Sequence, residues 1–174
     1  MKGWIHLSSA DILVDGFERI RDEVRDVVEG LSEEQLAWRA DKAANSIAWL
    51  VWHLTRVQDD HIAEVAGRPQ TWAAGGWAER FDLPFDLEET GYGAGVKDVA
   101  AVRADADLLV AYHDAVHAQT IDYVRTIGEE DLQKVVDDRW DPPVTLSVRL
   151  VSVISDDLQH VGQAAFVRGL ITRR

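Results

Sequence analysis

Hydrophobic residues recur every three or four positions in four long stretches of the chain, at 9–29, 47–66, 98–126 and 145–170. In the first stretch the apolar positions are Ile12, Phe17, Ile20, Val24, Val27 and Val28. This spacing places them along one side of a helix, while charged residues cover the other side. The pattern therefore predicts four long helices.

Residues that begin and end helices lie where this pattern requires them. Polar residues suited to cap an N-terminus precede the expected starts: Ser8 or Ser9, Asn45 or Ser46, and Thr145. Gly30 and Gly67 follow the first two stretches, as expected at helix C-termini. Between them, Ser32 and Gln35 have the spacing of a capping box and predict a short helical turn.

The pattern breaks from Gly67 to about Gly95, a segment with six glycines, two prolines and the aromatic residues Trp72 and Trp77. Long connections of this kind are often functional. The two tryptophans fit a pocket mouth or a plug that fixes the loop to the bundle, and we favour the plug. The chain is thus predicted to be an all-α four-helix bundle with a long crossover connection, in one domain spanning 1–174.

The expected core combines residues from the last three helices: Trp49, Leu50, Leu54, Leu109, Tyr112, Leu150, Val153 and Ile154. Before the fourth helix, Val135–Val136 and Arg139–Trp140 fit a short extended piece. No sheet is indicated.

Composition excludes several functions. The chain has no cysteine, so a metal site must use His, Asp, Glu and water. A net charge of −13 repels phosphate backbones, which argues against nucleic-acid binding. No stretch approaches the ~20 apolar residues that span a membrane, and the N-terminal residues 1–6 lack a basic-then-apolar signal pattern. We therefore expect a cytoplasmic protein.

Two pairs of residues have the spacing that lets side chains share a metal. Asp156 and His160 are four apart in the last helix, as are His113 and His117 in the third. The first pair fits either half of a metal site or a plain hydrogen bond on a half-buried face. Its best third ligand is His53, although sequence alone favours a structural role for a histidine in such an apolar run. Because Asp114 and Gln119 look solvated, we interpret the second pair as an exposed helix face.

Three motifs resemble the DinB/YfiT-like superfamily, in particular its actinobacterial DinB-like branch. They are the turn at 30–39 (GLSEEQLAWR), the run at 46–54 (SIAWLVWHL) and the closing His160-Val161-Gly162-Gln163. Each motif is loose, but their order and spacing over nearly the whole chain are fairly specific.

The resemblance implies a four-helix bundle that holds a divalent metal through one histidine of the second helix and two ligands of the fourth. Carried over, the ligands are His53, Asp156 and His160, with Asp156 where many relatives have His. Two histidines and one carboxylate suit zinc or nickel, and also iron. Asp157 and Gln163 are candidates for orienting the ligands. The resemblance also implies a homodimer, which exposed tryptophans would favour.

Known activities of the superfamily are thiol-dependent, and include mycothiol-dependent maleylpyruvate isomerase and mycothiol or bacillithiol S-transferases. The resemblance thus implies a metal-dependent S-transferase that activates a low-molecular-weight thiol, its co-substrate, for attack on a small electrophile. One alternative is a binding or stress-response bundle with a structural or vestigial metal. A weaker one is a metal-dependent hydrolase.

Overall fold

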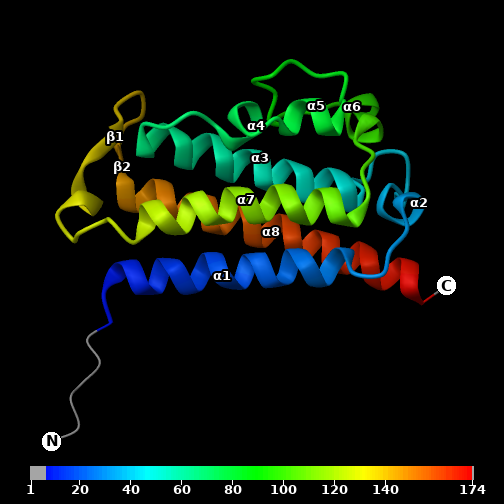
Figure 1. The fold of residues 1–174 in the computed structure, drawn as a ribbon, viewed down its shortest axis with the longest axis horizontal. Coiled ribbons are helices and arrows are strands. Elements are labelled where there is room, and N and C mark those ends of the chain that lie inside the picture. Colours follow the sequence, from blue (N-terminus) through cyan, green and yellow to red (C-terminus); the bar gives the residue numbers. More distant parts are fainter. Residues whose placement is uncertain (1–6, 174) are drawn as a thin grey trace, which may run out of the picture.

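A computed structural model describes residues 7–173, so the N-terminal segment used above for the signal-pattern expectation lies outside the described residues. Four long helices dominate it: α1 (Ser9–Val28), α3 (Ile47–Ala66), α7 (Ala106–Val124) and α8 (Leu146–Thr172) (Figure 1). The connections hold shorter elements: α2 (Glu33–Leu36), α4 (Thr71–Ala74), α5 (Trp77–Phe81), α6 (Val96–Ala101), the 3₁₀ turn η1 (Asp131–Gln133), β1 (Val135–Asp137) and β2 (Val144–Thr145). The predicted all-α bundle is confirmed.

The predicted caps explain where the long helices begin. The side chains of Ser8, Ser46 and Thr145 accept hydrogen bonds from backbone N–H groups in the first turns of α1, α3 and α8. Gly67 ends α3 in the left-handed conformation at φ 62°, which glycine adopts without steric cost. The capping box of Ser32 and Gln35 forms at α2.

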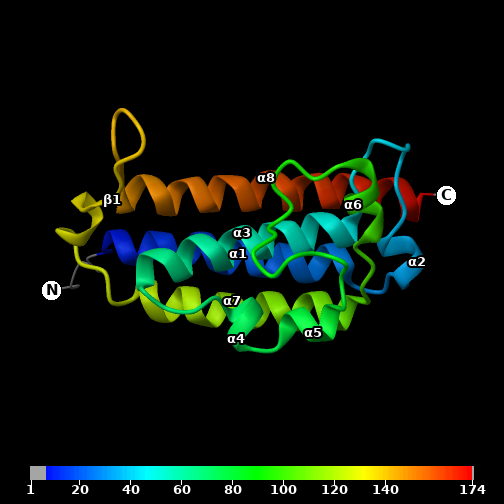
Figure 2. The same cartoon turned by 90° about the horizontal axis from the view of Figure 1, so that it is seen from above.

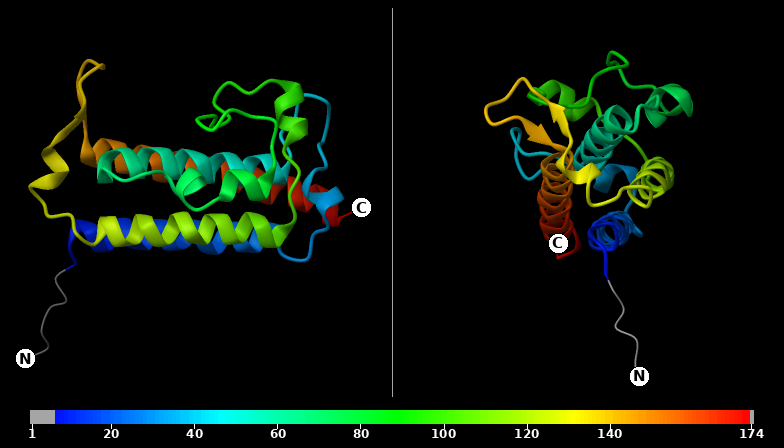
Figure 3. Two further views of the ribbon diagram at one scale, coloured as in Figure 1. Left: turned by 45° about the horizontal axis from the view of Figure 1, so that its top comes forward. Right: turned by 90° about the vertical axis from the view of Figure 1, so that its left-hand side faces the viewer.

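The order of the helices requires a long crossover. Helix α3 packs along α8, and α1 packs along α7. Contacts of α1 with α8 and of α3 with α7 complete the bundle. Helices α3 and α7 run in the same direction, as Figure 2 shows, so residues 67–105 must return along the bundle before α7 begins. This crossover lies over α3 (Figure 3).

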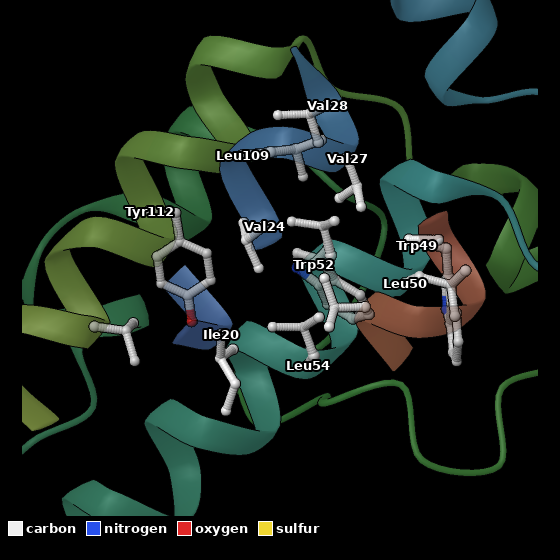
Figure 4. Packing of buried hydrophobic residues seen from close by; sticks show 14 of the residues in the cluster. Ile20, Val24, Val27, Val28, Trp49, Leu50, Trp52, Leu54, Leu109 and Tyr112 are labelled. Carbon is white, nitrogen blue, oxygen red and sulfur yellow. The ribbon is translucent and has the colours of Figure 1, made fainter. Parts of the chain in front are cut away.

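Seven of the eight expected core residues are buried, and Ile154 is half-buried against this core. Figure 4 shows Ile20, Val24, Leu54, Leu109 and Tyr112 grouped between the helices. Trp72 and Trp77 are also buried, with ring centroids 5.2 and 5.5 Å from that of Tyr112, so the crossover is fixed by an aromatic plug, as expected. Ile12, assigned to the apolar stripe of α1, is instead 66% exposed, because the buried face there runs through Leu13 and Phe17.

Two predictions about the backbone were wrong. The third helix does not run unbroken over 98–126. It is divided into α6 and α7 by an extended residue, Val102, and α7 is newly capped by Asp105, whose Oδ1 accepts from Leu108 N at 2.7 Å. A sheet is also present: β1 and β2 pair as a short antiparallel hairpin before α8.

Within residues 7–173 the structure has no helix long and apolar enough to cross a membrane.

Candidate metal centre

The structure brings together the three residues expected to bind a metal. His53 lies on α3, and Asp156 and His160 lie one turn apart on α8, the helix packed antiparallel to α3. One potential ligand atom from each residue lies within 4.8 Å of the others. His160 Nε2 is 3.6 Å from Asp156 Oδ1, and the two imidazole rings are 4.8 Å apart. We refer to these three residues as the triad.

The proton on His53 is placed by a backbone carbonyl. Nδ1 of His53 lies 2.6 Å from the Thr90 carbonyl oxygen, which can only accept, so Nδ1 carries the hydrogen. Nε2 then keeps its lone pair free. Burial lowers the pKa of His53 from its usual 6.5, which keeps the ring neutral and able to ligate. The ring of Trp49 stacks on it at 4.6 Å.

Gly91 lets the crossover approach this histidine. A Cβ atom at Gly91 would lie 2.8 Å from His53 Nδ1 and 3.0 Å from the Trp52 ring. Its φ of +91° is also one that side-chain-bearing residues rarely adopt. The carbonyl of Thr90 therefore reaches His53 because the next residue is glycine.

His160 and Asp156, the other two members of the triad, also have atoms that are free to bind a metal. His160 Nδ1 lies 3.4 Å from Gln163 Oε1, a long contact in which the histidine donates. This contact again leaves Nε2 free, on the side of Asp156. Asp156 Oδ2 is buried and has no hydrogen-bond partner among the described residues. Two lone pairs and an orphaned carboxylate oxygen are the donor set that a divalent cation satisfies, so the residues fit a metal.

Asp157, the other residue considered as an orienting partner, is fully buried. Neither of its oxygens has a hydrogen-bond partner within the described part of the chain, so no hydrogen bond joins it to the triad. Burial raises its pKa well above the usual 3.8, and the charge of Asp156 adds to the effect.

The interpretation of His113 and His117 as an exposed face was wrong. Both are buried, at 1% and 6% exposure, between α7 and α1. Their neighbours are cationic: Arg21 Nη1 lies 3.5 Å from His117 Nε2, and Arg25 binds Asp114, the nearest carboxylate in sequence, at 2.7 Å. Burial, together with the charges of His117, Arg25 and Arg21, lowers the pKa of His113 to about 3, although the carboxylate of Asp114 opposes the shift.

A pocket of about 410 Å³ opens beside the triad. His53, Val57 and His61 line it from α3, and Ser152, Val153 and Asp156 from α8. The crossover adds Thr90 and Tyr92, and the hairpin loop adds Trp140. The sequence prediction missed Thr90 and His61. A backbone carbonyl leaves no signal in sequence, whereas the position of His61 eight residues after His53, on the same helical face, could have indicated it.

Comparisons with known proteins identify the fold and the family of the chain. No curated protein matches the chain by sequence. A solved structure described as a conserved protein of locus from Enterococcus faecalis superposes with a TM-score of 0.90 at 29% identity, covering 97% of this chain and 100% of that one. The Mycothiol-S-transferase family matches residues 12–173. Since that match covers nearly the whole chain and includes all three residues of the triad, the chain belongs to the mycothiol S-transferase family.

Proposed function

We propose that the protein is a divalent-metal-dependent mycothiol S-transferase, with His53, Asp156 and His160 as the metal ligands and zinc or nickel as the ion. The observation that carries the proposal is the shared tautomer of the two histidines. Each commits Nδ1 to an oxygen acceptor and leaves Nε2 free beside Asp156. Partners of this kind orient metal-bound histidines and raise their basicity.

A bound ion would supply one kind of chemistry here, which is to lower the pKa of the thiol so that its sulfur is a thiolate at neutral pH. The thiol proton leaves to solvent. Sulfur then forms a bond to the carbon of the electrophile, and the leaving group departs from that carbon with its electron pair. The chain itself orients the ligands, holds the electrophile in the adjoining pocket and supplies no cysteine that would compete for it.

The test is metal binding followed by thiol transfer. Purified protein is stripped with chelator, loaded with zinc or nickel, and assayed with benzyl chloride and either mycothiol or glutathione. We expect one ion per chain, and turnover with mycothiol that requires the metal. Stoichiometric metal without turnover of any thiol would favour the structural-metal alternative. Hydrolysis of an ester panel without thiol transfer would favour the hydrolase.

We also propose that the protein forms a homodimer through α8. Val148, Val151, Leu158 and Phe166 lie along one side of this helix and are 46% to 66% exposed. Their spacing of three, seven and eight residues places them on one face, and no charged residue interrupts it. The family resemblance implies a second copy as the partner, and an uncharged apolar face lets two copies meet despite the repulsion expected from a net charge of −13. Sedimentation should show a dimer that Val151→Glu converts to a monomer. A monomeric wild type would contradict this.

A further inference from the structure

The pocket beside the triad has a second polar end, two helical turns away. His61 follows His53 by eight residues, which is about 12 Å along α3 and returns to the same face. Both histidines line the pocket, with Val57 between them. Figure 2 shows that α3 and α8 run antiparallel. His61 accordingly contacts Arg149, near the start of α8, while His53 lies close to Asp156 and His160 further along that helix.

Arg149 determines which nitrogen of His61 carries the proton. Its Nη1 lies 2.5 Å from His61 Nδ1. A guanidinium can only donate, so Nδ1 is the acceptor and the hydrogen of the neutral ring is on Nε2. Arg149 is 8% exposed and is held in turn by Asp137 at 3.2 Å and Glu64 at 3.6 Å. A change of tautomer at His61 would therefore break its hydrogen bond with a buried and otherwise paired arginine.

Burial and the charge of Arg149 keep this ring neutral. Burial lowers the pKa of His61, and Arg149 lowers it further, while Asp60, Glu64 and Asp156 oppose the shift. The side chain is still 34% exposed. Among residues 7–173 no hydrogen bond is made by Nε2, so the ring offers a fixed, accessible N–H donor.

We propose that His61 binds an uncharged oxygen of the electrophile and so selects substrates that carry one. The inference rests on the proposed function, because it concerns the second substrate of the same reaction. An uncharged acceptor is favoured over a carboxylate, since Asp60 lines the same end of the pocket. Trp140 and Tyr92 line the pocket between crossover and hairpin and suit an aromatic body. The preferred electrophile is thus an aromatic molecule with a carbonyl or hydroxyl group remote from its reacting carbon.

Binding of unreactive analogues tests the proposal without any chemistry. Para-acetylbenzyl alcohol and para-ethylbenzyl alcohol have nearly the same shape, and only the first has the remote carbonyl. We expect wild type to bind the acetyl compound roughly 5- to 10-fold more tightly, as one neutral hydrogen bond implies. His61→Leu should abolish this preference, and His61→Gln, which retains an N–H donor, should restore part of it. An unchanged preference in His61→Leu, or none in wild type, would overturn the proposal.

Ser152→Ala is the matched control, because Ser152 is a second polar side chain lining the same pocket. It should keep the preference for the acetyl compound. Loss of the preference in Ser152→Ala, with His61→Leu unaffected, would assign the contact to the serine instead. Nitrogen NMR provides an independent check, since His61 should show protonated Nε2 and unprotonated Nδ1, and the opposite tautomer would contradict the donor role.

Turnover of the corresponding chlorides then separates this inference from the proposed function. Sulfur displaces chloride at the benzylic carbon, and the para-acetyl group itself changes the reactivity of that carbon, so each chloride is compared between wild type and His61→Leu. In the variant, KM for the acetyl chloride should rise while kcat for the same chloride changes little. If wild type binds the acetyl analogue preferentially but transfers no thiol, the proposed function fails and the His61 contact stands. If KM for the acetyl chloride is the same in wild type and His61→Leu, the His61 proposal fails and the transferase activity stands.

Discussion

Two pairs of residues with four-residue spacing, Asp156 with His160 and His113 with His117, face different neighbours across the bundle. His160 and Asp156 on α8 meet His53 of α3, and free nitrogen and oxygen atoms lie within 4.8 Å of one another. His113 and His117 on α7 meet Arg21 and Arg25 of α1, and their rings are 6.3 Å apart and nearly parallel. Spacing along one helix therefore does not define a metal site. The opposing helix decides whether the pair sees a third ligand or a guanidinium that repels a cation.

The largest effect should come from removing a ligand of the triad. His53→Ala or His160→Ala should weaken metal binding by more than about 100-fold, beyond the loss caused by removing an orienting partner. His113→Leu and His117→Ala should retain one ion per chain. The measurement is metal stoichiometry and competition with a chelator, with circular dichroism to check folding. Metal retained by His160→Ala but lost in His113→Leu would reverse the comparison.

A smaller loss should follow from a methyl group beside the triad. In Gly91→Ala the new Cβ would meet His53 Nδ1 at 2.8 Å, so the histidine or the crossover must shift. We expect metal affinity to fall roughly 10- to 100-fold, as for other disturbed orienting contacts. Gly93→Ala is the matched control, because it has a similar φ of +73° but nothing within 4 Å of the added atom. Equal losses in both variants would show that backbone strain, and not the contact with His53, is responsible.

The pair on α7 should instead affect how the free energy of unfolding depends on pH. His113 has a pKa of about 3 when folded and 6.5 when unfolded, so below pH 6.5 the unfolded chain takes up a proton that the folded chain refuses. The free energy of unfolding should fall as pH drops from about 6.5 towards 3, by up to about 1.4 kcal/mol per pH unit from this residue. Denaturant unfolding from pH 7 to 4 should give a shallower slope for His113→Leu. Identical slopes would refute the assignment.

The smallest effect should be at the exposed partner of His160. Gln163→Ala removes a 3.4 Å contact on a solvent-exposed side chain, and water can replace the acceptor. We expect less than about a threefold change in metal affinity by chelator competition. A loss as large as that of Gly91→Ala would mean that both histidines depend equally on their acceptors.

The long helices could be predicted from the sequence because the residues that start and end them lie within or next to each helix. Ser46 and Gly67 mark the limits of α3 with cap chemistry that needs no partner from elsewhere. The break before α7 was missed because the residues around Val102 suit a helix, and only the cap by Asp105 interrupts it. The hairpin was missed because its paired residues, 135–137 and 144–145, are too few to show an alternating pattern.

The candidate metal site was likewise predictable only in part from local sequence. Spacing joined Asp156 to His160 and made His53 the best candidate for a third ligand. Only the family resemblance favoured a ligand over a structural role for His53, since spacing within one helix cannot indicate what faces it. The same limit explains the error at His113: a polar neighbour such as Asp114 is typical of a solvent-exposed face, whereas this carboxylate binds Arg25 of α1. Packing between helices determines which residue on another helix a side chain contacts, and the residues next to it in the sequence do not indicate that partner.

The acceptor that fixes His53 is a main-chain carbonyl, which has a consequence for how the protein tolerates mutation. Any residue placed at position 90 would bring the same oxygen, so substitutions there leave the proton of His53 where it is. Insertions and deletions in the crossover would behave differently, because they change which carbonyl arrives. Metal affinity should therefore tolerate a change of side chain at this position but not a change in the length of the loop that carries it.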